Sequence, residues 1–215
     1  MIIWTEPVEL QQRTFMMPFG VLKIVQAGDP VLRRVARPVT PEEIRSREIE
    51  QLVEWMRETM RDAPGVGLAA PQVGLPVQLA VIEDRAELLA SMSPERLAER
   101  QRRPVPFQVL FNPRIETGGE QVEFFEGCLS LAGFSAIVPR WLRVSVSCLD
   151  HRGEPVTFDA EGWHARIVQH EADHLNGTLY VDRMRSRSLT TLENLNRHWN
   201  GLPIGEALAR LQMAD

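Results

Sequence analysis

Residues 169–177, with the sequence QHEADHLNG, constrain this chain more than any other segment. On a helix, His170 and His174 would lie one turn apart on the same face, so that both imidazoles can reach one metal ion. Glu171 would lie about 100° further around the helix, where its carboxylate can handle the proton of a bound water instead of ligating the ion. The segment therefore predicts half of a metal site, and its geometry favours hydrolysis.

A catalytic site of this type needs a third protein ligand and an open position for water. The other histidines are expected on the wrong face of the same helix, in a hairpin turn and near the C-terminus: His164, His151 and His198. Cys128 is a better donor, because it follows a predicted strand within the sequence EGCLS, and its thiolate would complete a Cys, His, His site. The alternative, a buried structural cysteine, is the interpretation that we give to Cys148, which lies on an alternating strand.

The composition indicates one domain over residues 1–215 and excludes several classes of protein. The chain is 44% hydrophobic, and its net charge of -5 gives no basic field for nucleic acid, so no direct DNA binding is expected. Two cysteines fit a reducing compartment. The first residues lack a targeting pattern, and the longest uncharged apolar region, residues 127–139, is too short to cross a membrane. We expect a cytoplasmic protein, or the mature form of a mitochondrial one.

Hydrophobic periodicity predicts both helices and strands. We expect an α+β fold in which small antiparallel sheets pack around a central helix that carries the two histidines. The predicted helices span residues 41–62, after a capping box at Thr40 and Glu43, and 161–175, with weaker stretches at 189–199 and 204–213. The predicted strands are residues 77–82, 107–112, 121–125, 136–138, 143–149 and 155–158, with a short strand or docking segment at 21–25. Residues 150–153 are predicted to be the turn of a hairpin, and the charged residues 84–103 a solvated insertion without ligands.

Three separated motifs resemble the signature motifs of the peptide deformylase family. They are GVGLAAPQ at residues 65–72, EGCLS at 126–130 and QHEADHLNG at 169–177, and they occur in the family's order. The resemblance covers about residues 20–185 and leaves 186–215 as a C-terminal extension. The sequences around Phe134 and Trp163 resemble the branch of the family that includes the organellar enzymes.

The resemblance implies that Cys128, His170 and His174 bind one metal ion per chain. In the family this ion is usually Fe²⁺, and Zn²⁺, Ni²⁺ or Co²⁺ can occupy the same site. The resemblance further implies that a metal-bound water attacks a formyl carbon, with Glu171 as the general base and later the acid. The implied reaction removes the formyl group from the initiator formylmethionine of nascent peptides and releases formate, with the ribosome near its exit tunnel as a further partner.

Other motif residues are implied to hold the substrate. Gln72 and the backbone N–H of Leu129 would stabilise the oxyanion, because negative charge develops on the carbonyl oxygen during attack. Backbone groups of Val66, Gly67 and Gly127 would hydrogen-bond an extended peptide, which explains the small residues in these loops. A surface amide is the alternative for Gln72.

The sequence also departs from the family. Ser135 stands where the commonest bacterial members carry an arginine beside the peptide, and Trp163 and Arg166 occupy helix positions near the methionine pocket where smaller or aliphatic residues are common. These departures leave the peptide preference open, and plain core packing is the alternative for Trp163. Asp173, which lies between the two histidines, is predicted to pair with Arg140 and to orient the site.

Two other functions remain open on the sequence. A zinc endopeptidase would also use a His-Glu-x-x-His helix, although a cysteine as third ligand argues against it. A catalytically silent metal-binding or ribosome-associated module would retain the ligands without using Glu171.

Overall fold

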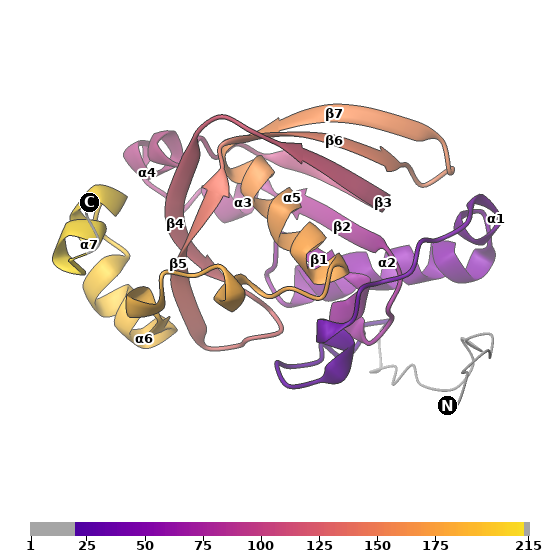
Figure 1. Ribbon diagram of the computed structural model, residues 1–215, viewed down its shortest axis with the longest axis horizontal. Helices are drawn as coiled ribbons and strands as arrows, with labels where there is room; N and C mark the ends of the chain where they lie inside the picture. The colour runs from indigo at the N-terminus through magenta and orange to yellow at the C-terminus, as the bar shows by residue number, and fades with distance from the viewer. Residues whose placement is uncertain (1–19, 213–215) are drawn as a thin grey trace.

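The computed structural model describes residues 20–212, which form an α+β fold with two antiparallel sheets (Figure 1). The larger sheet has the order β1-β2-β3-β6-β7, with bounds Gly67–Ala69, Leu79–Asp84, Val105–Thr117, Arg143–Leu149 and Pro155–Glu161. The smaller sheet has the order β4-β5-β8, with bounds Gln121–Gly127, Phe134–Trp141 and Thr190–Thr191. The central helix α5 (Gly162–Leu175) contacts strands of both sheets, so the predicted fold class is confirmed.

The remaining helices lie around these sheets. The α-helices are α1 (Pro41–Ile44), α2 (Arg47–Asp62), α3 (Ala86–Leu89), α4 (Pro94–Glu99), α6 (Leu192–Asn194) and α7 (Ile204–Arg210). The 3-10 helices are η1 (Pro30–Arg33), η2 (Ala70–Val73), η3 (Tyr180–Asp182) and η4 (Ser186–Ser188). The element η5 (Leu195–Trp199) is a π-helix. Within residues 20–212, no helix is long and apolar enough to span a bilayer.

The predicted helix at residues 41–62 is two helices, because the chain contains two caps. Thr40 forms the predicted capping box with Glu43 at the start of α1. Ser46 then accepts a hydrogen bond from the backbone N–H of Ile49 at 3.3 Å and starts α2 in a new direction. Ser46 lies inside an apparently continuous periodic pattern, which hides the second cap at the level of sequence.

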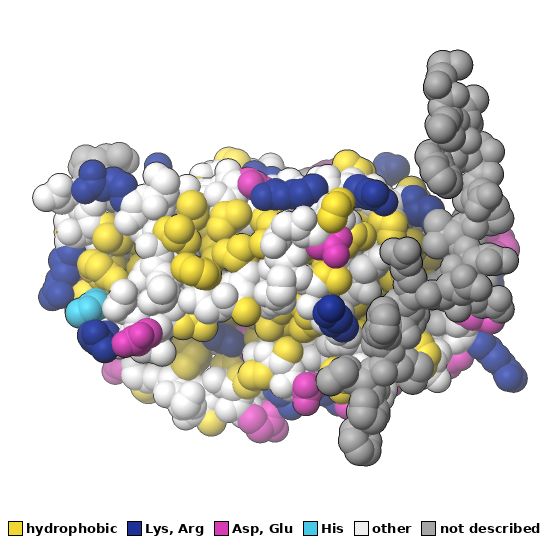
Figure 2. All heavy atoms as spheres, turned by 90° about the horizontal axis from the view of Figure 1, so that it is seen from below, with side chains coloured by type: hydrophobic (Ala, Val, Ile, Leu, Met, Phe, Trp, Pro, Cys, Tyr) yellow, Lys and Arg dark blue, Asp and Glu magenta, His cyan; other side chains and the backbone are white. Residues whose placement is uncertain are grey.

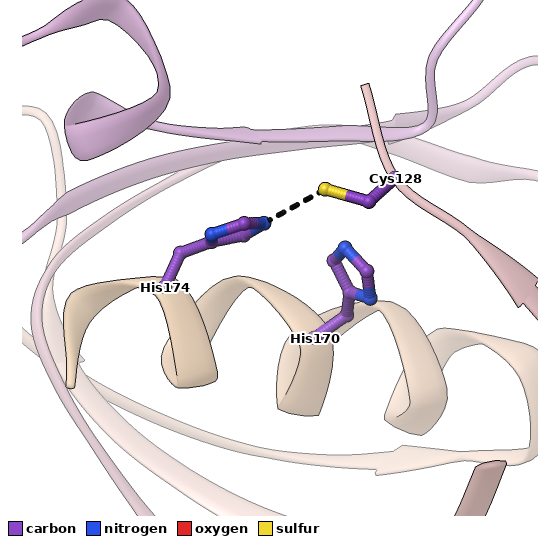
Figure 3. A group of neighbouring side chains, drawn as sticks. All are labelled: Cys128, His170 and His174. Carbon is purple, nitrogen blue, oxygen red and sulfur yellow. Dashed lines mark hydrogen bonds between the residues drawn. The ribbon is translucent and has the colours of Figure 1, made fainter. Parts of the chain in front are cut away.

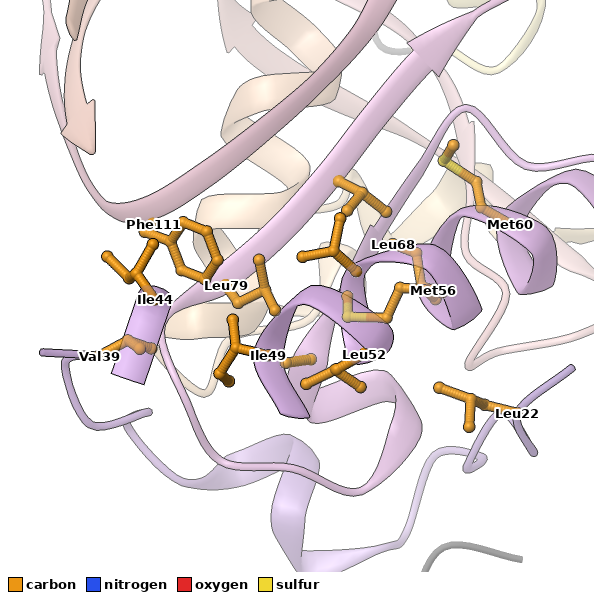
Figure 4. Packing of buried hydrophobic residues seen from close by; sticks show 13 residues of the cluster. Leu22, Val39, Ile44, Ile49, Leu52, Met56, Met60, Leu68, Leu79 and Phe111 are labelled. Carbon is orange, nitrogen blue, oxygen red and sulfur yellow. The ribbon is translucent and has the colours of Figure 1, made fainter. Parts of the chain in front are cut away.

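The larger sheet is covered on both faces, which fixes the position of α5. Side chains of α2 pack with Leu68, Leu79 and Phe111 in one cluster, shown in Figure 4. The opposite face of the sheet forms a second cluster with α5, through residues such as Val146 and Ile167. Burial of apolar surface on both faces stabilises the sheet, and it holds α5 in contact with β1 and β2.

The structure tests two further predictions, the hairpin turn at residues 150–153 and the short strand or docking segment at residues 21–25. The hairpin turn is confirmed by the hydrogen bond from the backbone N–H of Gly153 to the carbonyl of Asp150 at 3.0 Å. Residues 21–25 form no strand, but the segment docks: Leu22 is buried, and the N–H of Val25 donates to the carbonyl of Gln72 at 2.9 Å. The first residues, from which a targeting pattern was judged missing, lie outside the described residues.

The C-terminal segment returns to the body of the protein. Residues 189–199 were predicted to be helical from their first residue, but Thr190 and Thr191 form β8 and pair with β5 before the helical turns begin. Further along, Asn200 accepts a hydrogen bond from the Arg96 guanidinium at 2.7 Å, and the backbone N–H of Ile204 donates to Glu99 at 2.8 Å. The segment is therefore attached both to the sheet and to α4.

Candidate active site

The two histidines of α5 and the cysteine that follows β4 lie together, as the sequence predicted (Figure 3). The ligand atoms of Cys128, His170 and His174 are all within 4.8 Å of one another. The Cys128 sulfur lies 3.2 Å from Nε2 of His174. His164 lies elsewhere, because its Nε2 is 3.1 Å from Gln108 and its ring stacks on Phe158.

Glu126 fixes the orientation of His170, a role that the sequence did not reveal. Its Oε2 lies 3.1 Å from Nδ1 of His170, so that the carboxylate accepts from Nδ1–H and leaves Nε2 for the site. The same buried carboxylate accepts hydrogen bonds from Arg140 at 2.9 and 3.0 Å and from Arg166 at 2.7 Å. Burial opposes its charge, but the cation of Arg140 and the hydrogen bond from His170 hold the pKa of Glu126 well below its usual range.

The predicted pair of Asp173 and Arg140 is present. Nη1 of Arg140 donates to Asp173 at 2.6 Å, and Arg183 donates to the same carboxylate at 2.8 Å. Arg140 thus links Asp173 on α5 to Glu126 on β4. This link holds the helix and the strand in a fixed relation beside the three ligands.

The residues present fit a divalent metal ion. A thiolate and two imidazoles are the donors that Zn²⁺ and Fe²⁺ accept, and three such donors leave one position open. The backbone N–H of Ser130 at 3.4 Å and the amide of Gln72 at 3.6 Å both donate toward the Cys128 sulfur. Nδ1 of His174 is buried without a hydrogen-bond partner among the described residues, and burial lowers the pKa of this histidine, as ligation by a neutral imidazole requires.

Glu171 lies beside these ligands in a setting that raises its basicity. The side chain is buried, and its Oε2 has no hydrogen-bond partner in the described part of the chain. Burial raises the pKa of Glu171 to about 7, which suits a group that must both accept and return a proton near neutral pH. The carboxylate reaches this place because Gly67 on β1 has no side chain: a Cβ there would lie 2.2 Å from Oε1.

Gln72 points into the site and is not a surface amide. Its Oε1 accepts from the backbone N–H of Ala69 at 2.8 Å, which fixes the side chain. Its Nε2 lies 3.6 Å from the Cys128 sulfur and 3.3 Å from the Ser130 hydroxyl, and only 1% of the residue is exposed. The amide N–H groups of this buried glutamine are therefore positioned at the ligand cluster.

A cavity of about 500 Å³ gathers the residues that the motifs predicted. Its lining includes Val66, Gly67, Gln72, Gly127, Cys128, Leu129, His170 and Glu171. His174 lies behind this lining, where it is almost fully buried. A larger cavity of about 770 Å³ lies between α2 and the β6–β7 hairpin, but it contains none of the motif residues. The smaller cavity is therefore the candidate active site.

The rim of this cavity is apolar. Phe134 and Leu192 line it and are each 43% exposed. Figure 2 views the molecule from below Figure 1 and shows hydrophobic side chains gathered across the middle of that face, with charged groups around them and a few among them. Such a surface suits an extended peptide that carries an apolar side chain.

The departures from the family pattern have different positions. Trp163 and Arg166 both line the cavity, so Trp163 is more than core packing. The Ser135 hydroxyl instead donates to the backbone carbonyl of Glu126 at 2.7 Å and is buried.

The prediction that residues 84–103 are only a solvated insertion is wrong, because Arg100 and Arg102 line the cavity and lie over the Trp163 ring. Charge alone suggested solvation, whereas a guanidinium can also stack on an aromatic ring.

The family model for polypeptide deformylase matches residues 21–189. This chain belongs to the peptide deformylase family. The match includes all three motifs, the three clustered ligands and Glu171.

Relatives of the deformylase family occur in organelles and in bacteria. The chain is 48% identical over 174 residues to the chloroplastic peptide deformylase 1A of Solanum lycopersicum, an overlap that covers 80% of this chain and 63% of the tomato protein. It therefore spans less than two thirds of the length of that relative. It is 44% identical to the mitochondrial peptide deformylase of Homo sapiens, with 79% and 70% of the two chains covered. It is 48% identical to peptide deformylase 1 of Streptomyces coelicolor, with 84% and 81% covered.

A solved structure supports the same fold. The class I type b peptide deformylase of Acinetobacter baumannii, with Met-Ala-Ser bound, superposes with a TM-score of 0.68 at 35% identity, covering 76% of this chain and 98% of that one. The predicted resemblance to a branch with organellar members is likewise supported by the plant and human relatives.

Proposed function

We propose that this chain is a metal-dependent hydrolase that removes the formyl group from the N-terminal formylmethionine of nascent peptides and releases formate. The observation that carries the proposal is the cluster of Cys128, His170 and His174 beside the buried carboxylate of Glu171. The family match over residues 21–189 supports the same activity.

The proposed roles follow from the positions of the side chains. A divalent ion held by Cys128, His170 and His174 would supply a Lewis acid that lowers the pKa of water and polarises the formyl carbonyl. Glu171 takes a proton during attack on the formyl carbon and returns it to the amine that leaves. Because burial holds its pKa near 7, both transfers are accessible at neutral pH.

The lining of the cavity holds the substrate in this proposal. The amide of Gln72 and the backbone N–H of Leu129 donate to the oxygen on which negative charge develops. Backbone groups of Val66, Gly67 and Gly127 bind the peptide in an extended form. The absence of a side chain at Gly67 makes room for the Glu171 carboxylate, and both glycines line the cavity that would hold a strand-like substrate beside β1 and β4.

We propose Fe²⁺ as the ion in the cell, with one ion per chain, and Zn²⁺, Ni²⁺ or Co²⁺ as ions that the same ligands accept. A thiolate beside Fe²⁺ is open to oxidation by air. Activity of the iron form should therefore decline in air, while nickel and cobalt forms persist. Equal stability of all forms in air would count against iron.

The direct test is formate release from formyl-Met-Ala-Ser after anaerobic purification, with metal analysis of the same sample. Formate should be released without cleavage of internal peptide bonds, which separates this activity from that of an endopeptidase. Glu171→Ala should retain the metal and release no formate. An inactive wild-type protein with a full complement of metal would overturn the proposal.

The cellular setting is proposed on less direct grounds. Relatives include both bacterial and organellar proteins, and we propose the bacterial cytoplasm, with a mature mitochondrial form as the alternative. Nascent chains are the proposed partners, and ribosome association is testable by co-sedimentation. We also propose a single domain with a core at residues 20–185 and an extension at 186–215, supported by the limits of the family match.

A further inference from the structure

Arg100, which follows α4, enters the active-site cavity from a segment that carries none of the family motifs. Its guanidinium lies 4.9 Å from the ring of Trp163 and 5.7 Å from the ring of Phe124. A guanidinium that stacks by its face keeps its N–H donors in the plane of the group, where they are free to meet a planar acceptor. Arg100 is thus placed as a donor at the wall of the cavity.

Among the described residues Arg100 has no carboxylate partner, in contrast to Arg102, Arg140 and Arg166. Within residues 20–212 it makes no salt bridge, and its Nε is buried without a hydrogen-bond partner. The neighbouring acids are already engaged: Asp84 accepts from Arg102 at 2.7 Å, and Glu99 accepts from the backbone N–H of Ile204 at 2.8 Å. Glu126 is likewise held by Arg140 and Arg166.

The environment of Arg100 is unfavourable for a cation that stays alone. Burial lowers its pKa to about 10, and the charges of Arg96 and Arg102 act in the same direction. Stacking on an aromatic ring offsets only part of the cost of burying a charge. An anionic group of a ligand would offset the remaining cost of burying this charge. Arg100 can therefore bind a ligand in addition to packing on the aromatic rings.

A second, smaller cavity shows where such an anion would lie. This cavity of about 160 Å³ shares Arg100, Phe125, Gly127 and Leu192 with the active-site cavity, but it contains none of the three metal ligands. Glu99 also lines it, with its carboxylate held by the backbone N–H of Ile204. Trp199 and Ala207 of the C-terminal segment form its outer wall. Gly127, whose backbone is proposed to bind the extended peptide, lines both cavities together with Arg100, which puts the smaller cavity on the path of residues that follow the formylated methionine.

We propose that Arg100 is a specificity-determining residue of a downstream subsite, which binds a carboxylate of the peptide between α4 and the C-terminal segment. The carboxylate comes either from an Asp or Glu side chain after methionine or from the C-terminus of a short peptide. This inference rests on the proposed deformylase activity and assigns a substrate preference to the same site.

The test compares peptides that differ only in one carboxylate. Formyl-Met-Ala-Ser is measured with a free and with an amidated C-terminus, and the amidated series also includes Glu or Gln at the second or third position. We expect kcat/KM to favour the carboxylate by about fivefold or more in at least one pair, because charge-assisted hydrogen bonds to a partly buried guanidinium discriminate by at least this amount. The pair that shows the preference identifies the source of the carboxylate.

Variants then assign the preference to Arg100. Arg100→Gln should reduce the ratio within that pair to about one, and Arg100→Lys should retain part of it. The ratio is taken within each variant, so a general loss of activity or packing cancels. Arg143→Gln removes an exposed arginine of β6 and should keep the wild-type ratio, which controls for net charge.

Two results would overturn the inference. One is wild-type enzyme that hydrolyses amidated formyl-Met-Ala-Ser but shows no preference in any pair. The other is a preference that persists in Arg100→Gln. A wild-type protein that hydrolyses none of the peptides would instead contradict the proposed function itself.

Discussion

Because Gly67 lies so close to Glu171, one methyl group added at position 67 should reduce the catalytic rate much more than it reduces the stability of the fold. In Gly67→Ala, the new Cβ would lie 2.2 Å from Oε1 and 2.9 Å from Cγ of Glu171 if nothing moved. An ordinary contact begins at 3.4 Å, so the carboxylate must retreat by about 1 Å or slightly more. Gly67 does not have a positive φ, and its backbone therefore accepts alanine without strain.

A displacement of about 1 Å in a catalytic group typically costs about a hundredfold in rate, so kcat/KM for formate release should fall by about this factor. The free energy of unfolding should fall by only about 1–3 kcal/mol, because a side chain yields more easily than backbone. Formate release, metal content and thermal denaturation measured on one preparation distinguish the two effects.

Gly127→Ala is the matched comparison. A Cβ at this position would lie 3.5 Å from the carbonyl oxygen of Phe134, which is an ordinary contact. We expect a loss of less than about tenfold, because Glu171 keeps its place. If Gly67→Ala kept more than a tenth of the wild-type kcat/KM with its metal bound, the idea that β1 positions Glu171 would be wrong.

Three further substitutions test the charges of the site. Because the pKa of Glu171 rises to about 7 on folding, its ionisation destabilises the metal-free protein as pH increases from about 4.5 to 7. Glu171→Gln should remove this dependence and raise the free energy of unfolding at pH 8 by up to about 3 kcal/mol, measured by urea denaturation. Glu126→Gln leaves Arg166 without a carboxylate partner and Arg140 with Asp173 alone, so the protein should lose about 3–5 kcal/mol of stability and bind metal about 10–100-fold more weakly in a chelator competition. A loss below about 1 kcal/mol would argue against this network. Gln72→Leu should lower kcat by about 10²–10³-fold with metal retained, whereas an unchanged kcat would exclude an oxyanion role.

The sequence predicted the parts of the site that depend on local spacing. Two histidines four residues apart must share a helical face, so α5 and its ligands were expected without any tertiary information. Asp173 was expected to point away from the metal for the same reason, and its contact with Arg140 is confirmed. The position of Cys128 could not be predicted from local spacing, because its proximity to α5 depends on how β4 packs beside the helix.

Other features depend on contacts between distant segments, which carry no local signal. Glu126 contacts Arg140, Arg166 and His170, which lie 14, 40 and 44 residues away in the sequence. The residues next to Glu126 in the sequence do not predict these contacts. Charged, helix-prone segments usually lie in solvent, so the sequence predicts an exposed Arg100. The contact of Arg100 with the ring of Trp163 depends on tertiary packing and could not be predicted from the segment itself. The break between α1 and α2 was missed because Ser46 is compatible with either a cap or a helix interior.

The return of the C-terminal segment to α4 has a consequence for the order in which the site is completed. During synthesis, the metal ligands and Glu171 leave the ribosome before Trp199 and Ala207, which wall the smaller cavity. A chain interrupted after α5 would contain the three candidate ligands and Glu171 and still lack one wall of the smaller cavity, where we propose that the peptide binds. For the same reason, an affinity tag fused after Asp215 begins only a few residues beyond α7, so peptide-length preferences measured on such a fusion should be compared with those of a protein tagged elsewhere.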